Sequence, residues 1–280
     1  MSDLAKKSII ATALLGVIYA AAIIMPSSFS YITVAMILLV LLIWKFYFNV
    51  AFTLSAAWEK AKFLIIPMIF NVGALYLTTL FFQTFAKVII VVLVTLTNYF
   101  LWVALRKVHN LSDRAAILHR NILIVLSFVS VFLGSATIFR LFILFSTSES
   151  RMYFQMLLTV LIFILFYIVS YFLTWENAAD EDLVKLRPYN IVNSLLGAEI
   201  AWVSSIWIVN YPVISVAEKA NLGATPLPAI LLTIVFYFLW GIIFHKLDRS
   251  LTRRVLTEYV LVTFVFVLVL LVTARWLPIY

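Results

Sequence analysis

Long runs of apolar residues, separated by short polar or charged segments, make up most of the chain. The runs lack the alternation of apolar and polar positions that is typical of outer-membrane barrel strands. About 20 apolar residues suffice for one helical crossing, and such a helix satisfies its own backbone hydrogen bonds in lipid. The pattern therefore predicts an all-α, polytopic transmembrane helical bundle. We expect nine spans, near residues 9–25, 32–47, 63–82, 88–105, 122–139, 152–174, 190–209, 229–244 and 259–274.

Composition excludes a soluble globular protein. The 280 residues are 65% hydrophobic and 11% charged, whereas soluble domains carry about 25% charged residues. The segments between the predicted spans are too short to fold alone. We therefore expect residues 1–280 to form one integral-membrane domain without a soluble domain.

The distribution of basic residues predicts the orientation in the membrane. Of the 20 Lys and Arg residues, 15 lie in segments on the side of the N-terminus and 5 on the other side, with Lys45 counted in the loop after the second span. Short cytoplasmic loops carry the excess of Lys and Arg. The N-terminus is therefore expected in the cytoplasm and, after nine spans, the C-terminus outside.

The first apolar run could also be part of a signal peptide. Lys6 and Lys7 precede it, and Ala20-Ala21-Ala22 could be cleaved. The run of about 17 residues is longer than the apolar region of 7–15 residues in a secretory signal. We expect it to be retained as a span; cleavage would leave eight spans in the same orientation.

Two spans carry small residues at a spacing of four, which places them on one helix face. Such residues let two helix backbones approach closely. We interpret both sets as packing positions within one bundle, and a homodimer interface is the alternative. The sets are Thr12-Gly16-Ala20 and Gly197-Ala201-Ser205.

Three stretches near the cytoplasmic ends of spans are rich in aromatic residues, at 99–102, 171–175 and 237–240. Each stretch contains a tryptophan, the residue that marks membrane interfaces together with tyrosine. We interpret them as part of an interfacial aromatic belt. A vestigial repeat of helical hairpins is the alternative.

Glu199 is the one acidic residue that the predicted spans place near the middle of the bilayer. An ionised carboxylate at that depth costs roughly 2.5 kcal/mol or more, so it should be protonated or paired. Asn71 and Asn98 are expected at similar depth, which makes a Glu199–Asn71–Asn98 cluster the candidate midplane polar site. Such a cluster could relay protons or cations, contact a substrate or headgroup, or fix helix packing.

Basic loops on the predicted cytoplasmic side are the second candidate site. Each basic residue near an anionic membrane surface contributes about 1 kcal/mol of attraction. We therefore expect contacts with anionic lipid headgroups, or with a protein partner. The residues are Arg106, Lys107, Arg114, Arg120, Lys246, Arg249, Arg253 and Arg254.

The sequence contains few of the residues that catalysis or metal binding needs. It has no cysteine and three histidines, all in expected loops, so we expect no metal site. It lacks the phosphate-binding and dinucleotide-binding glycine patterns and the Gly-x-Ser-x-Gly and His-Glu-x-x-His motifs. We expect no catalytic residues and no cofactor, which disfavours an enzyme.

Two stretches resemble a known group of proteins. Gly197–Trp202 and Leu251–Trp276, the latter ending Thr273-Ala274-Arg275-Trp276, are similar to an uncharacterised bacterial family of multi-pass membrane proteins without an assigned activity. The resemblance implies a bacterial plasma membrane, which is the inner membrane in two-membrane bacteria. It also implies that the C-terminal helices form the part shared within the family.

Two functions fit these observations. The first is a non-enzymatic membrane component (an anchor, scaffold or assembly subunit) that acts through partners, which short loops and few polar residues in the spans favour. The second is a transporter or lipid or ion translocator that uses Glu199. Expected partners are membrane lipids with anionic headgroups and a protein partner or second copy, but no nucleic acid.

Overall fold

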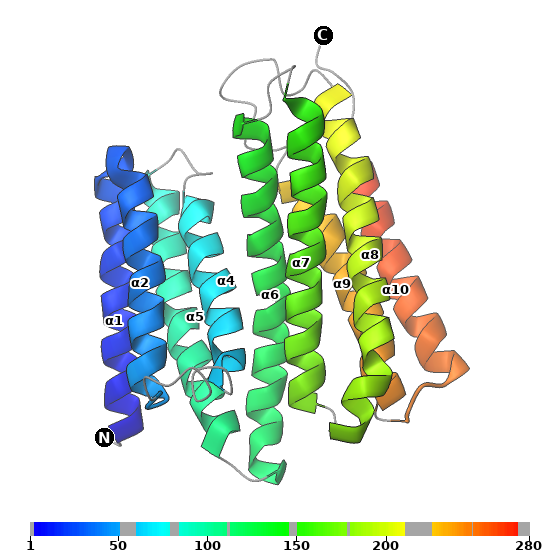
Figure 1. Ribbon diagram of the computed structural model, residues 1–280, viewed down its shortest axis with the longest axis horizontal. Coiled ribbons are helices and arrows are strands. Elements are labelled where there is room, and N and C mark those ends of the chain that lie inside the picture. The colour runs from blue at the N-terminus through cyan, green and yellow to red at the C-terminus, as the bar shows by residue number, and fades with distance from the viewer. Residues whose placement is uncertain are drawn as a thin grey trace. The chain divides into compact units, whose positions relative to one another are not determined.

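The computed structural model describes residues 3–50, 60–78, 84–110, 113–145, 150–177, 180–210, 226–247 and 249–273. These residues form nine α-helices, a short 3-10 turn and no strand (Figure 1). Each predicted span overlaps one helix, so the all-α fold is confirmed. The elements are α1 (Asp3–Ile24), η1 (Pro26–Ser28), α2 (Phe29–Tyr47), α4 (Lys62–Thr78), α5 (Thr84–Asn110), α6 (Asp113–Phe145), α7 (Arg151–Asn177), α8 (Asp180–Asn210), α9 (Pro226–Leu247) and α10 (Arg253–Thr273).

Within the described residues, six helices are long and apolar enough to cross a membrane: α1, α2, α5, α6, α7 and α9. Helix α4 is apolar but shorter. Large apolar side chains such as Val17 and Phe46 are exposed on these helices, as expected for surfaces that contact lipid. The chain is therefore a membrane-embedded, multi-pass protein.

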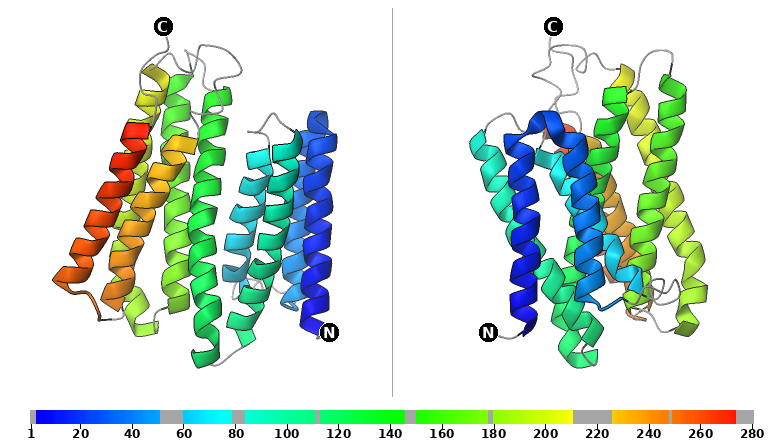
Figure 2. Two further views of the ribbon diagram at one scale, coloured as in Figure 1. Left: turned by 180° about the vertical axis from the view of Figure 1, so that it is seen from behind. Right: turned by 60° about the vertical axis from the view of Figure 1, so that its left-hand side comes forward.

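The chain divides into two compact units, residues 1–130 and 131–280, and the boundary falls within α6. In the first unit α1 packs against α2, α4 and α5, and α2 packs against α4; Figure 2 shows α1 and α2 side by side. Leu15 and Tyr19 are fully buried on the inner face of α1. A methyl group added to Gly16 would lie 3.3 Å from the Thr95 methyl on α5, so this glycine lets the two helices approach.

In the second unit α7 packs along α8, and α9 packs against both. A methyl group added to Gly197 would lie 2.6 Å from the ring of Phe166 on α7. Ala201 and Ser205 share the buried face of α8 with Gly197, and the Phe166 ring is edge-on to that of Phe236 at 5.1 Å. The interpretation of this small-residue set as packing within one bundle is confirmed.

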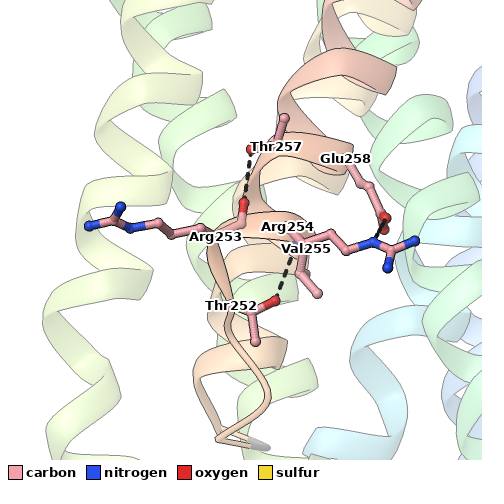
Figure 3. Close-up of polar contacts among 6 residues, drawn as sticks. All are labelled: Thr252, Arg253, Arg254, Val255, Thr257 and Glu258. Carbon is pink, nitrogen blue, oxygen red and sulfur yellow. Dashed lines mark hydrogen bonds and ion pairs between the residues drawn. The ribbon is translucent and has the colours of Figure 1, made fainter.

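Helix α10 packs on α9 and is otherwise exposed. Tyr259 is one of its contacts: the ring lies 5.4 Å from that of Tyr237 and would overlap a methyl group added to Gly241. The helix starts with an N-cap: the Val255 amide donates to Thr252 Oγ1 at 3.3 Å (Figure 3). Such a cap stabilises a helix by about 1 kcal/mol.

Two of the tryptophans in the aromatic stretches lie inside the units. Trp102 is fully buried and Trp240 is 2% exposed, so neither ring reaches lipid. The aromatic-belt interpretation is therefore wrong for these two residues. Trp102 instead packs on Tyr47, with ring centroids 5.4 Å apart, and thereby joins α5 to the end of α2.

Candidate functional site

In the first unit, both predicted amides gather around a tyrosine hydroxyl. Tyr19 on α1 donates to Asn71 Oδ1 on α4 at 2.8 Å, and the Asn98 side chain on α5 reaches the same hydroxyl. All three side chains are completely buried. The structure therefore brings Asn71 and Asn98 together, with Tyr19 as a third member that the sequence analysis did not select.

The amide groups of this cluster are directed at their own helices. Asn71 Nδ2 donates to the Pro67 carbonyl at 2.8 Å, and Asn98 Nδ2 donates to the Val94 carbonyl at 3.1 Å. Asn98 Oδ1 is buried without a hydrogen-bond partner in the described part of the chain. None of the three side chains is a carboxylate or an ammonium group, so the cluster joins α1, α4 and α5 by neutral hydrogen bonds.

Replacing Tyr19 with Phe removes the hydroxyl that joins the two amides while keeping the ring. Hydrogen bonds between membrane helices contribute on average about 0.6 and at most about 1.7 kcal/mol. We expect Tyr19→Phe to lower the free energy of unfolding by about 1 kcal/mol, measured by denaturation in mixed micelles. The double variant Tyr19→Phe/Asn71→Ala should lose less than the sum of the two single losses, because both changes remove the same Tyr19–Asn71 bond; full additivity would contradict the pairing.

Glu199 lies on α8 in the second unit, on an exposed face. Residues on either side of it along this face are large, apolar and exposed. We call this face the α8 stripe: Val192, Leu195, Leu196, Glu199, Val203 and Ile206. It is opposite the buried Gly197, Ala201 and Ser205 face, so the carboxyl group is directed out of its own unit.

A second polar set, between α7 and α8, was not predicted. Asn193 Nδ2 donates to Ser170 Oγ at 2.6 Å, and Asn190 Nδ2 donates to Thr174 Oγ1 at 3.0 Å. These four side chains are buried. Their spacing of three on α8 and four on α7 could have indicated two facing polar stripes. They hold α7 and α8 in register, on the side of α8 away from the α8 stripe.

At one end of the first unit, two predicted basic residues differ in their role. Arg106 Nη1 on α5 donates to the Tyr47 carbonyl at 2.8 Å, which is one of the last carbonyls of α2 and has no partner within its helix. Lys107 is half-buried beside it. Lys60 Nζ, outside the predicted set, donates to the next carbonyl, that of Phe48, at 2.6 Å. Arg106 and Lys60 therefore cap α2, where cations also interact favourably with the helix dipole.

The predicted basic residues of the second unit lie at the end of α9, in the α9–α10 turn and at the start of α10. Lys246 lies 4.1 Å from the ring centre of Tyr189 and donates to its hydroxyl. Arg249 adopts a positive φ of 51° in the turn that ends α9. Arg254 pairs with Glu258 at 3.1 Å, and Arg253 extends away from that pair (Figure 3).

Two predicted basic residues on α6 remain. Arg120 is half-buried. The side chain of Arg114 lies outside the described residues. The predicted basic residues whose side chains the structure describes thus lie on α5 and α6 in the first unit and on or near α9 and α10 in the second.

The fold defines an all-α, multi-pass integral membrane protein. Residues 224–273, which include α9 and α10, match the profile of a family described as proteins of unknown function, DUF5656. This match fits the resemblance of the C-terminal part to a family without an assigned activity. None of the curated proteins matches the chain, and none of the solved structures does.

Proposed function

We propose that the chain is a non-enzymatic membrane component that holds a partner protein through the α8 stripe. The observation that carries the proposal is the position of Glu199, an ionisable group in the middle of an exposed apolar helix face. Ionisable residues in membrane helices almost always face a protein interior or a water-filled cavity and are paired. A partner helix packed on the α8 stripe would bury the stripe and would pair with the Glu199 carboxylate.

The chemistry of the α8 stripe favours a particular occupant. A second copy on a two-fold axis would bring two Glu199 carboxyl groups together, and like charges at close range cannot both ionise. A helix with Lys, Arg, Asn or Gln at the matching depth would donate to the carboxylate instead. The proposed partner is therefore an apolar transmembrane helix with one such donor, and the anchor or assembly role follows from that contact.

We also propose that all nine helices cross a bacterial plasma membrane, with the N-terminus in the cytoplasm and the C-terminus outside. In the first unit, contacts of Arg106 and Lys60 join the predicted cytoplasmic ends of α2, α4 and α5. In the second unit, Lys246 near the end of α9 meets Tyr189 near the start of α8, again at ends predicted to be cytoplasmic. Each set of contacts joins helix ends that the predicted topology places on the cytoplasmic side, which supports the proposed orientation.

The orientation can be tested directly because the chain contains no cysteine. Met152→Cys and Leu251→Cys each place a single thiol at an exposed position, on predicted opposite sides of the membrane. In intact cells, a membrane-impermeant maleimide should label the thiol at 152 and leave the thiol at 251 unlabelled until the cells are opened. Labelling of position 251 alone in intact cells would reverse the proposed orientation.

The proposed function is tested by native mass spectrometry of the full chain extracted gently from its own membrane. We expect a stoichiometric protein companion that Glu199→Leu loses and that Glu199→Gln retains in reduced amount, because an amide still accepts a hydrogen bond. Glu258→Gln is the matched control, since it removes a carboxylate from the exposed surface of α10. This control should leave the companion bound.

Other outcomes favour other functions. A companion that survives Glu199→Leu would contradict docking through the α8 stripe. A chain without a protein companion but with a bound small ligand would favour the translocator instead, if Glu199→Gln loses that ligand. In the translocator, Glu199 would lie in a water-accessible path. In that case a thiol placed at Val203 should react with a water-soluble reagent from one side of the membrane.

A further inference from the structure

Basic side chains from two segments, residues 60–62 and the end of α5, gather at one end of the first unit, around the last residues of α2. We propose that this end binds the phosphate of an anionic phospholipid headgroup, through Arg106, Lys60, Lys62 and His109. The proposal is independent of the α8 stripe, which lies in the second unit. We call these four residues the headgroup site.

The two capping cations retain donors for a ligand. Arg106 uses Nη1 for the Tyr47 carbonyl, and a guanidinium group carries five N–H donors. Lys60 uses Nζ for the Phe48 carbonyl, and an ammonium group carries three. Both side chains are half-buried, so their positions are fixed by protein contacts before a ligand arrives. Fixed donors lose little conformational freedom on binding, which favours affinity.

Several positive charges converge at this end of the first unit. The positive charges of Arg106, Lys60 and Lys62 all act on the exposed His109 ring. The C-terminal dipole of α2 corresponds to only about half a negative charge. An anion beside these residues would therefore lower the repulsion among them.

Aromatic rings pack beside the cations of the headgroup site. The rings of Phe48 and Phe63 are stacked at 5.0 Å, and His109 is edge-on to both, at 5.5 and 5.1 Å. The Arg106 guanidinium lies 5.9 Å from the Phe48 ring centre. This stacking holds the cations against an apolar surface, which weakens competition from water.

The surroundings favour a phospholipid over free phosphate. An exposed apolar row runs along α2 at intervals of four residues: Val34, Leu38, Leu42 and Phe46. The row ends two residues before Phe48, around which the cations gather. A lipid could therefore lay acyl chains along the membrane-spanning part of α2 while its phosphate reaches the headgroup site.

The test measures the affinity of the full chain for phosphatidylglycerol, by titration in detergent micelles followed by native mass spectrometry. The Lys60→Gln/Arg106→Gln double variant should bind about 25-fold more weakly, from about fivefold for each cation removed. Arg151→Gln/Arg187→Gln is the matched control, since it removes two exposed cations from the second unit that are not among the basic residues expected to contact lipid headgroups. The control should change the affinity less than twofold.

The double variant also loses two caps on α2, so a variant that keeps both caps is needed. Lys62→Gln leaves the Tyr47 and Phe48 carbonyls bonded and should weaken binding about fivefold. Equal losses in the site variants and the control would overturn the proposal, because net charge alone would explain them. Phosphatidylcholine bound as tightly as phosphatidylglycerol, or inorganic phosphate that displaces the lipid at equal concentration, would overturn it as well.

Discussion

Gly197→Ala is expected to destabilise the protein by about 3 kcal/mol, although it adds a single methyl group. That methyl would lie 2.6 Å from two carbon atoms of the Phe166 ring. Phe166 is fully buried and its ring is fixed edge-on against Phe236, so it has no room to move aside. The helices must separate instead, which also weakens the Asn193–Ser170 and Asn190–Thr174 hydrogen bonds.

Gly16→Ala provides the matched comparison, since it is the same substitution in a helix of the first unit. Its methyl group would lie 3.3 Å from the end of the Thr95 side chain, which can shift by a few tenths of an ångström. Alanine also favours a helix over glycine by about 1 kcal/mol. We expect a change within about 1 kcal/mol of zero in mixed-micelle denaturation; similar losses in the two variants would contradict the packing described for α7 and α8.

Gly241→Ala is expected to release α10 from α9. A methyl group there would overlap the Tyr259 ring, and Tyr259 is part of the contact between α10 and α9, outside which α10 is largely exposed. Hydrogen exchange of the α10 amides should therefore accelerate at least tenfold, which corresponds to about 1.4 kcal/mol of lost packing. Exchange in α7 should be unchanged.

The double variant Gly241→Ala/Tyr259→Leu separates a local clash from a general effect. A leucine at 259 removes the ring that the methyl group would strike while keeping an apolar contact. Exchange of α10 should then return most of the way to that of the original protein. If the α10 amides of the double variant exchange as fast as those of Gly241→Ala, the contact between Gly241 and Tyr259 does not hold α10 on α9.

The positions of the helices were predictable because each coincides with an apolar run. Membrane spans depend on length and polarity, which a linear sequence contains directly. Which face of a span is buried was harder to predict, because the side chains on both faces are apolar. In α8 the small residues marked the inner face correctly, and Glu199, two positions from both Gly197 and Ala201, lies on the opposite face by helix geometry alone.

For the polar residues, the sequence predicted only their depth in the membrane. Asn71 and Asn98 were expected at the same level, and the structure joins them through Tyr19. The tyrosine could have been found as the one phenol within the aliphatic first span, because a buried hydroxyl needs a partner. The inclusion of Glu199 in that cluster stays a prediction. Arg106 was selected for its charge, and its cap on α2 depends on a tertiary contact that no local pattern contains.

Photo-crosslinking from the α8 stripe tests whether a partner helix docks there. Crosslinking residues at Leu195 and Val203 flank Glu199, and one at Val160, on an exposed part of α7, serves as control. Positions 195 and 203 are expected to capture one apolar helix of a partner protein, and this helix should contain Lys, Arg, Asn or Gln. Glu199→Leu should abolish the capture. Position 160 should react with lipid. Crosslinks from 195 and 203 only to lipid, or only to the first unit of the same chain, would contradict the claim.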